Sequence, residues 1–357
     1  MDAARLREQF PVLRRVAYLN AGTDGPVPSR AVVAAREELE REAAEGRLHP
    51  HFERRQELAS AQRDAYAGLL GCDPADVALT TSTSEGVGIA VRGLGLGEGD
   101  EILTSDEEHP GLLGPLQTAR DLFGVSVRAV ALGDLADAVG PRTRLVACSH
   151  VSWASGATAP PALAEVDVPV LFDGAQGIGA VPVDVESLGC DVYAGSGQKW
   201  LCGPDGTGML YVSATMRERL ASTARSYLTY ADVGPGLDAP LHEDARRYDT
   251  PSLPAEASAF ALTSLGVLAA EGWDEVHARA RGSAARLAEA LAERGHEVVD
   301  RAQTTLVCWH AADAEAARDR LAAAGVAIRD LPGRGLLRAS VGAWNDESDL
   351  ERLLEAL

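Results

Sequence analysis

Short apolar runs rich in valine, leucine and isoleucine recur through the first two thirds of the chain, separated by glycine turns or polar stretches. Such runs are typical of buried strands in a mostly parallel sheet, because both faces of that sheet are covered. The pattern predicts seven strands, at 77–80, 101–105, 125–131, 145–150, 168–173, 192–195 and 208–212. With helices between the strands, the sequence predicts an α/β fold.

Apolar residues three or four positions apart, with charges between them, follow a different period at 29–45 and 53–70. This spacing predicts amphipathic helices that bury one face. Beyond Pro251 the pattern predicts alanine-rich helices at 255–271, 275–294 and 314–324, short strands at 304–309 and 336–341, and a last helix at 347–357. We therefore expect a large domain at 26–251 and a smaller α+β domain at 252–357.

Composition narrows the class of protein. The formal net charge is −20 and no basic stripe interrupts it, so nucleic acid is not an expected partner. The five cysteines are scattered with no Cys-x-x-Cys pair, which argues for reduced thiols and against structural zinc. No apolar run approaches the roughly 18 residues of a membrane span, and the first residues lack the apolar core of a signal peptide. We expect a soluble, cytoplasmic protein that acts on small molecules without a metal.

Lys199 is the only lysine in a chain with 33 lysine and arginine residues, and it lies within Gly-Ser-Gly-Gln-Lys-Trp. A guanidinium stays protonated at ordinary pH, whereas a desolvated lysine amine can lose its proton and attack a carbonyl. A covalent nucleophile is one explanation for this single lysine. A coding bias toward arginine with one chance survivor is the other, and the lysine count does not separate them.

The residues that follow the predicted strands are the candidates for binding, because ligands collect beyond the carboxyl ends of an open parallel sheet. They comprise hydroxyls that open a helix, an imidazole, a carboxylate and the amine, in the segments 80–86, 106–109, 173–176 and 196–199. Pyridoxal phosphate (PLP) uses all four: its aldehyde needs a lysine, its ring nitrogen needs a carboxylate, its phosphate suits a helix N-terminus rich in hydroxyls, and an imidazole can stack on its ring. Each signal alone is also explained by a turn or a helix cap, but together they favour this cofactor.

Five stretches also carry a family resemblance: Tyr18-Leu-Asn20-Ala-Gly, Asp-Glu-Glu108-His109, Ser149-His-Val-Ser-Trp153-Ala-Ser-Gly156, Asp173-Gly-Ala-Gln176 and Ser196-Gly-Gln198-Lys199. Their order and spacing resemble the class V aminotransferase family. This group of fold type I PLP enzymes includes cysteine desulfurases, selenocysteine lyases, isopenicillin N epimerases and related C–S lyases. The resemblance implies the PLP-dependent transferase fold, with a segment at 1–25 that packs near the active site and the small domain.

The resemblance also implies a role for each matching residue. Lys199 forms the Schiff base with PLP, Asp173 pairs with the pyridinium nitrogen and His109 stacks on the ring. Hydrogen bonds to the ring hydroxyl and the phosphate come from Gln176, Thr83, Ser84, Ser196 and Gln198, and from Thr250 of the neighbouring subunit in a homodimer. The carboxylate of an amino-acid substrate binds to Arg338, with Asn20 beside it.

Two features depart from the cysteine desulfurases. Their catalytic thiol lies on the loop before the carboxylate-binding arginine, and here that loop, 330–337, contains no cysteine. Cys308 falls inside a predicted strand, where it is expected to pack. Trp153 stands where desulfurases and selenocysteine lyases place asparagine, so a large ring is expected to reshape the substrate pocket.

These departures favour a PLP-dependent C–S lyase that works by β-elimination without a catalytic cysteine. A class V aminotransferase and an epimerase of the isopenicillin N epimerase type are the alternatives. A PLP-binding protein without catalytic activity is a more remote one.

Four other features have plainer interpretations. The glycines at 93, 95 and 97 resemble a dinucleotide loop, but they follow a helix and precede a strand, which favours a turn. His49 and His51 have no evident third metal ligand, so a surface turn is expected there. His150 and Cys202 are expected to pack in the core rather than to take part in catalysis.

Overall fold

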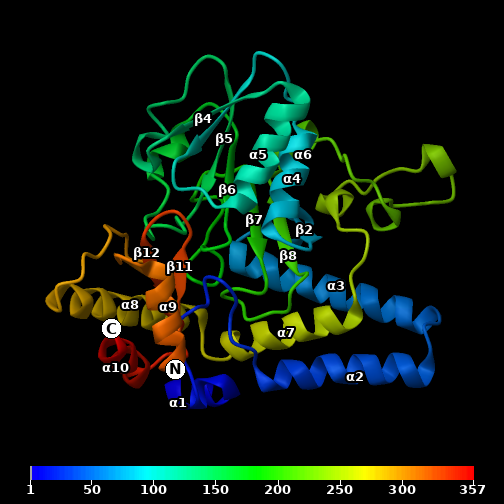
Figure 1. The fold of residues 1–357 in the computed structure, drawn as a ribbon. Helices are drawn as coiled ribbons and strands as arrows, with labels where there is room; N and C mark the ends of the chain where they lie inside the picture. Colours follow the sequence, from blue (N-terminus) through cyan, green and yellow to red (C-terminus); the bar gives the residue numbers. More distant parts are fainter. Residues whose placement is uncertain (1) are drawn as a thin grey trace.

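The computed structural model describes residues 2–357, and its centre is a seven-stranded sheet with the order β2-β8-β7-β6-β5-β3-β4 (Figure 1). Strand β8 runs antiparallel to both of its neighbours, β2 and β7, and the other neighbouring pairs in this sheet are parallel. The strands are β2 Val77–Thr80, β3 Glu101–Ser105, β4 Ser126–Val130, β5 Thr143–Ser149, β6 Val170–Asp173, β7 Val192–Ser196 and β8 Gly208–Val212. The predicted seven-stranded, mostly parallel sheet is confirmed.

Side chains along each central strand alternate between two apolar layers. In β6, Leu171 packs in the layer that contains α4 (Thr83–Gly93) and α5 (Pro110–Phe123). Phe172 packs in the opposite layer, which contains α3 (His49–Leu70). Because both faces are buried, such a strand is apolar throughout, and the sequence pattern therefore located these strands well.

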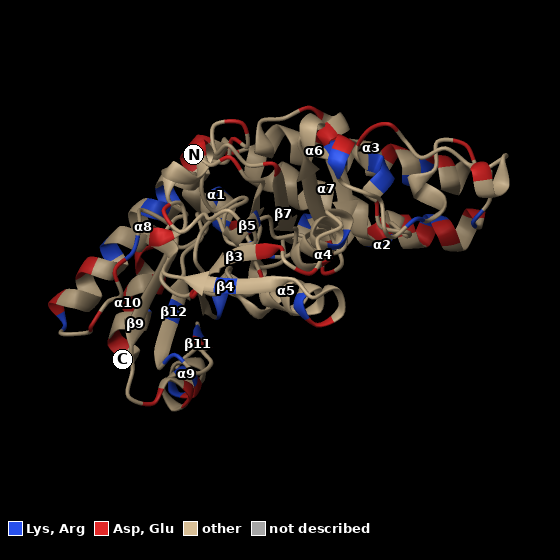
Figure 2. Cartoon of the chain, turned by 90° about the horizontal axis from the view of Figure 1, so that it is seen from above, with Lys and Arg blue, Asp and Glu red and all other residues tan. Residues whose placement is uncertain are grey.

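Helices α3, α7 (Ala255–Ala269) and α2 (Ser29–Glu45) lie side by side below the sheet in Figure 1, with α7 in contact with the other two. Acidic and basic positions interleave along α2 and α3 (Figure 2). Another short helix, α6 (Ala214–Arg219), follows β8. Within residues 2–357, none of the helices is both long and apolar enough to cross a membrane.

The C-terminal part contains a three-stranded antiparallel sheet in the order β11-β12-β9. Its elements are α8 Trp273–Glu293, β9 Leu306–His310, α9 Ala314–Ala323, β10 Val326–Ala327, β11 Arg329–Leu331, β12 Leu336–Ser340 and α10 Glu347–Ala356. The N-terminal segment, with α1 (Ala3–Glu8) and β1 (Ala17–Tyr18), joins this part because β1 pairs with β10. The domain limits at 25 and 251 stay predictions.

The structure corrects several details. The surface turn expected at His49 is wrong: α3 begins there, and Pro50 lies in its first turn, where a proline costs the helix no hydrogen bond. The predicted strand at 125–131 is shorter at both ends, whereas the one at 145–150 begins two residues earlier, at Thr143. The glycine turn is confirmed, since α4 ends at Gly93 and β3 starts at Glu101. Strands β1, β10 and β11 have too few residues to show a period in the sequence.

A buried ion pair gives a test of this packing. Arg63 Nη2 on α3 lies 2.8 Å from Asp249 Oδ2, and Asp249 Oδ1 accepts the N–H of Leu79 in β2 at 2.8 Å. Removing one partner leaves the other charge buried and uncompensated. We expect Asp249→Ala to lower the free energy of unfolding by about 3–5 kcal/mol, seen as a lower urea midpoint.

Two further variants serve as controls. Replacing both partners, as Arg63→Met with Asp249→Leu, is expected to recover part of the loss because no charge stays buried. Asp121→Ala removes the exposed ion pair with Arg120 and should leave the midpoint unchanged. An unchanged urea midpoint in Asp249→Ala would show that the buried ion pair does not stabilise the fold.

Candidate active site

Three neighbouring parallel strands bring the predicted side chains to one edge of the sheet. The register aligns Ser149 of β5 with Asp173 of β6, and Asp173 with Ala194 of β7. Lys199 follows the end of β7 by three residues. The predicted carboxylate and amine therefore lie at the same edge, as the carboxyl ends of parallel strands require.

The loop that carries Lys199 is held from two sides. The N–H of Gly197 donates to the carbonyl of Thr207 at 2.8 Å, which closes the loop between β7 and β8. From the N-terminal segment, the N–H of Gly25 donates to the carbonyl of Gln198 at 2.7 Å. A Cβ at Gly25 would lie 2.1 Å from the carbonyl oxygen of Lys199, so only glycine permits this approach. The N-terminal segment thus fixes the lysine backbone.

Burial lowers the pKa of the Lys199 amine to about 8, because a desolvated ammonium is unfavourable. The Asp173 carboxylate opposes this change and the Arg338 guanidinium adds to it. At pH 7 about a tenth of such amines are unprotonated, against roughly one in three thousand for an ordinary lysine. The Lys199 amine can therefore act as a nucleophile and as a base near neutral pH.

Asp173, the last residue of β6, is a buried carboxylate with few partners. Its Oδ1 accepts the N–H of Ala175 at 2.9 Å, and within residues 2–357 it forms no ion pair. Burial raises its pKa, and the Lys199 amine and the Ala175 N–H partly offset the rise. A buried carboxylate of this kind fits a ligand that presents a cationic N–H.

Hydroxyl groups gather where α4 begins. Thr83 Oγ1 and Ser196 Oγ lie 2.6 Å apart in a hydrogen bond, and the N–H of Thr83 donates to Ser196 Oγ at 3.2 Å. Ser84 is the next residue of this first helical turn, whose N–H groups suit a phosphate. The buried side-chain oxygen of Gln198 has no hydrogen-bond partner in the described chain. The structure therefore brings Thr83 and Ser196 together, with Ser84 next to Thr83 and Gln198 two residues after Ser196 in the sequence.

His109 is the N-cap of α5, and its Nδ1 accepts the N–H of Gly111 at 3.0 Å. Its ring meets the Trp153 ring edge to face, with centroids 4.9 Å apart. Burial, followed by the charges of Lys199 and of nearby arginines, lowers the pKa of His109 to about 4. The imidazole is therefore neutral at physiological pH and can present its face to an aromatic ligand.

Arg338 on β12 is fully buried, yet it faces no carboxylate among residues 2–357. Its Nη1 donates to the carbonyl of Trp153 at 3.1 Å, and its Nη2 donates to Thr23 Oγ1 at 3.4 Å. The Nε atom is buried without a hydrogen-bond partner in that range, and burial lowers the pKa of the guanidinium to about 10. Asn20 contacts the group through Thr23, whose hydroxyl donates to Asn20 Oδ1 at 2.8 Å. A substrate carboxylate fits this unfilled donor set.

Two predicted ligands have partners within the chain. Gln176 donates through Nε2 to the carbonyl of Gly22 at 2.7 Å and accepts at Oε1 from Trp200 Nε1 at 3.0 Å, which leaves one amide hydrogen for another acceptor. Thr250 is buried beside β2, where its N–H donates to the carbonyl of Leu79 at 2.8 Å. Its contact with a second subunit stays a prediction.

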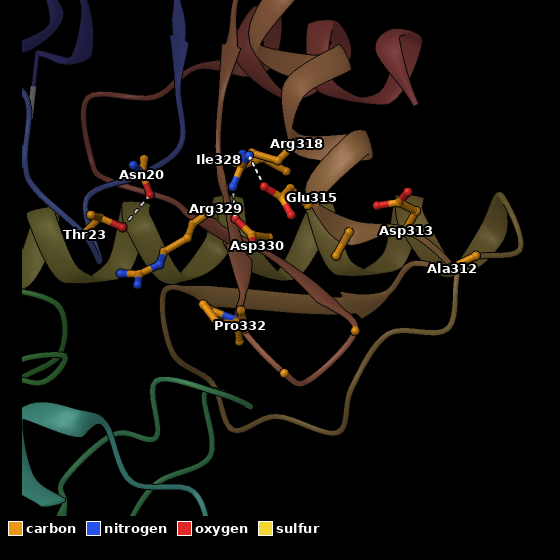
Figure 3. A pocket seen from close by; sticks show the side chains of 14 residues that line it. Asn20, Thr23, Ala312, Asp313, Glu315, Arg318, Ile328, Arg329, Asp330 and Pro332 are labelled. Atoms are coloured by element: carbon orange, nitrogen blue, oxygen red, sulfur yellow. Dashed lines mark hydrogen bonds and ion pairs between the residues drawn. The ribbon is translucent and has the colours of Figure 1, made fainter.

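Arg329 and Arg334 were not identified from the sequence. Arg329 lines a cavity of about 890 Å³ together with Asn20 and Thr23, and Figure 3 shows its guanidinium turned away from Arg318. The segment Leu331-Pro-Gly-Arg-Gly-Leu336 has the turn residues of a β-hairpin. Recognising that hairpin would have placed Arg329 opposite Arg338 and Arg334 in the turn between the two strands.

The two core assignments are confirmed. His150 is buried, and its Nδ1 lies 3.0 Å from the hydroxyl of Tyr193. Cys202 has no exposed surface, and burial raises its pKa well above the usual value.

Comparison with known proteins adds independent findings. A family model described as aminotransferase class-V matches residues 17–353. Isopenicillin N epimerase of Amycolatopsis lactamdurans is 29% identical, with 99% of this chain and 97% of the relative covered. A probable cysteine desulfurase of Pseudomonas aeruginosa is 32% identical, with 87% and 84% covered. The isopenicillin N epimerase of Streptomyces clavuligerus is 32% identical, but the chain spans only 59% of its length.

Solved structures of one protein, C-DES, match over almost the full chain. A C-DES variant with glycine covalently linked to its PLP cofactor has a TM-score of 0.93 and 26% identity, and 98% of each chain is covered. The cystine C–S lyase C-DES in complex with its product cysteine persulfide has a TM-score of 0.91 and 27% identity, with 97% of this chain and 98% of the other covered.

The donor set fits PLP. The buried Asp173 suits a ring N–H, and the helix start at Thr83 suits a phosphate. Lys199 supplies the amine that the aldehyde needs, and its pKa of about 8 favours the attack. Together with the family match, these observations identify PLP as the cofactor.

The single lysine permits a direct test of its pKa. In cofactor-free protein, the rate at which an amine reagent labels Lys199 should rise with pH with a midpoint near 8, because burial disfavours the ammonium form. Peptide mass spectrometry separates this label from that on the α-amino group. A midpoint near 10 would show that the amine is solvated.

Asp173→Asn provides the matched control for the same experiment. The carboxylate raises the pKa of Lys199, so its removal should move the midpoint below that of the wild-type protein. A midpoint that stays or rises in this variant would show that the two groups do not interact.

Proposed function

Because the chain belongs to the class V aminotransferase family of PLP-dependent enzymes, we propose that it is a C–S lyase. The substrate is a cysteine-type amino acid, and the reaction is a β-elimination that uses no protein thiol. The observation that carries this proposal is the state of the cysteines. Among residues 2–357, none of the five is exposed, and four are buried.

Each thiol is also held in its protonated form. Burial raises the pKa of Cys308 to about 12, and it raises the pKa of Cys202 and of Cys148 well above the usual value. Because the thiolate is the form that attacks sulfur, these residues are poor sulfur acceptors. The loop between β11 and β12, where desulfurases keep their thiol, has Pro332, Gly333, Arg334 and Gly335.

PLP supplies an electron sink that makes the α-hydrogen of a bound amino acid acidic. Lys199 is the base that removes this proton, since its pKa of about 8 leaves part of the amine free at neutral pH. Arg338 binds the α-carboxylate and fixes the orientation of the substrate. His109 is neutral and packs against Trp153, so it contributes an aromatic face without adding a charge.

The overall reaction balances without an added oxidant or reductant. Lys199 takes the α-proton of the substrate, and the sulfur substituent leaves as a thiol. Water then hydrolyses the remaining enamine, which yields ammonia and pyruvate. A desulfurase, in contrast, transfers sulfur to its own cysteine and releases alanine. The two reactions are therefore distinguished by their carbon product.

Epimerisation is the second candidate, favoured by the isopenicillin N epimerase relative that covers nearly the whole chain. It shares the proton removal by Lys199 but returns a proton to the opposite face of the α-carbon. In heavy water it would incorporate deuterium at that carbon while the sulfur substituent stays attached. Transamination would instead require a keto acid as acceptor.

We also propose that the protein is a cytoplasmic homodimer in which Thr250 contacts the phosphate in the neighbouring subunit. Family membership supports this arrangement. The segment between α6 and α7 extends away from the body in Figure 1 and exposes Tyr227, Val233 and Leu237. A second copy would cover these side chains. The mass of the native particle tests the dimer.

The first experiment incubates the PLP-loaded protein with cysteine, cystine and S-substituted cysteines and measures pyruvate, alanine and released sulfur. We expect pyruvate from the wild-type protein. Lys199→Ala should lower its rate by at least about a hundredfold, since it removes the positioned base. Asp121→Ala is the surface control and should retain full activity.

Other product patterns would overturn the proposal. Alanine with sulfur left on the protein would indicate a desulfurase, whereas α-deuterium exchange without pyruvate would indicate the epimerase. Full activity in Lys199→Ala would contradict the mechanism itself. An absorption spectrum unchanged by every amino acid tried would indicate a PLP-binding protein without catalytic activity.

A further inference from the structure

Two arginines stand directly opposite each other beside the active site. In the antiparallel pair β11–β12, the register aligns Arg329 with Arg338. Directly opposed residues project from the same face of a sheet, and like charges in that position destabilise it. Neither guanidinium has a carboxylate partner within residues 2–357.

The side chain of Arg329 is half-buried and makes no hydrogen bond or ion pair in the described part of the chain, although its charge opposes the rise in the pKa of Asp24. Its charge nevertheless acts on the site. After burial and the charge of Lys199, it is the next cause of the lowered pKa of His109, and it adds to the lowering at Lys199. The guanidinium therefore lies near both groups with its donors free.

A third arginine occupies the loop where the desulfurases keep a thiol. Arg334 donates from Nη2 to the carbonyl of Asp106 at 3.0 Å, which ties this loop to the turn before His109. Its guanidinium carbon lies 5.8 Å from the centroid of the Trp153 ring, and that of Arg329 lies at the same distance. Trp153 thus has two cations beside it, and its own Nε1 is buried without a hydrogen-bond partner in the described chain.

We infer that the substrate carries a second anionic group, and that Arg329 and Arg334 bind this group beside Trp153. This inference rests on the proposed function, because the anion stands at the far end of the sulfur substituent. A carboxylate or a sulfonate fits the two guanidinium groups. It is distinct from the other two anion sites, since the α-carboxylate belongs to Arg338 and the phosphate to the start of α4.

The adjoining cavity provides room for such a substituent. Its volume is about 890 Å³. Thr23, Arg329, Pro332 and Gly333 line one part of it, and Arg318 with the carboxylates Asp313, Glu315 and Asp330 also belong to its lining. An anion at this place must approach a chain whose formal net charge is −20. Two guanidinium groups with free donors offset that repulsion locally.

The test compares ligands that differ only in this charge. The carboxymethyl and carbamoylmethyl thioethers of mercaptopropionate have nearly the same shape, and both keep the carboxylate that Arg338 binds. Neither has an amine, so neither reacts at Lys199. We expect calorimetry on the PLP-loaded wild-type protein to show at least about tenfold tighter binding of the carboxymethyl ligand, as for a charged hydrogen-bonded pair.

Variants then assign the preference to residues. Arg329→Gln and Arg334→Gln should each reduce the ratio of the two dissociation constants severalfold, and Arg334→Lys should retain part of it because the charge remains. Arg120→Gln makes the same change of charge on the exposed face of α5 and should leave the ratio unchanged. Equal affinities in the wild-type protein, or a ratio unaltered in both glutamine variants, would overturn the inference.

A turnover measurement keeps the two proposals separate. With S-carboxymethylcysteine and S-carbamoylmethylcysteine, kcat/KM for pyruvate formation should show the same preference. If neither compound yields pyruvate while the analogues still bind with a tenfold difference, the anion site stands and the proposed elimination fails. If both yield pyruvate equally well and the analogues bind equally, the elimination stands and the anion site fails.

Discussion

The electrostatic coupling of the buried Asp173 carboxylate and the half-buried Lys199 amine is the constraint on which the rest of the site depends. Asp173 ends one strand and Lys199 follows the end of the adjacent parallel strand, and burial raises the pKa of the carboxyl group and lowers that of the amine. Each partly restores the charge of the other, which leaves the amine with a pKa of about 8. The packing of Gly25 against the lysine loop and the apolar layers on both faces of the sheet maintain this arrangement.

The main strands and helices could be predicted from the sequence because the patterns that indicate them are local. Fully buried strands are continuous apolar runs, and α2 shows one helical period between the bounds that the structure has. The candidate site could be predicted because the positions of its residues follow from the order of the strands. Parallel strands bring the residues that follow them to one edge of the sheet, so the sequence alone predicts that Asp173 and Lys199 lie close together.

The residues that the sequence did not predict depend on the register between segments that are far apart in the chain. Arg329 lies opposite Arg338 only because β11 pairs with β12 in this register, and a shift by one position would turn its side chain to the other face. Arg334 was also not predicted, because its contacts are with Asp106 and Trp153, which are far away in sequence. The start of α3 was missed because Pro50 suggests a turn as readily as a helix start.

We propose that sulfur leaves the substrate without passing through a protein thiol. The most direct measurement is intact-mass spectrometry of the protein during turnover of cystine, together with the yield of pyruvate. We expect one pyruvate for each substrate cleaved and an unchanged protein mass, because none of the thiols is exposed and burial raises their pKa values. Protein that gains the mass of a sulfur atom, with alanine as the carbon product, would contradict it.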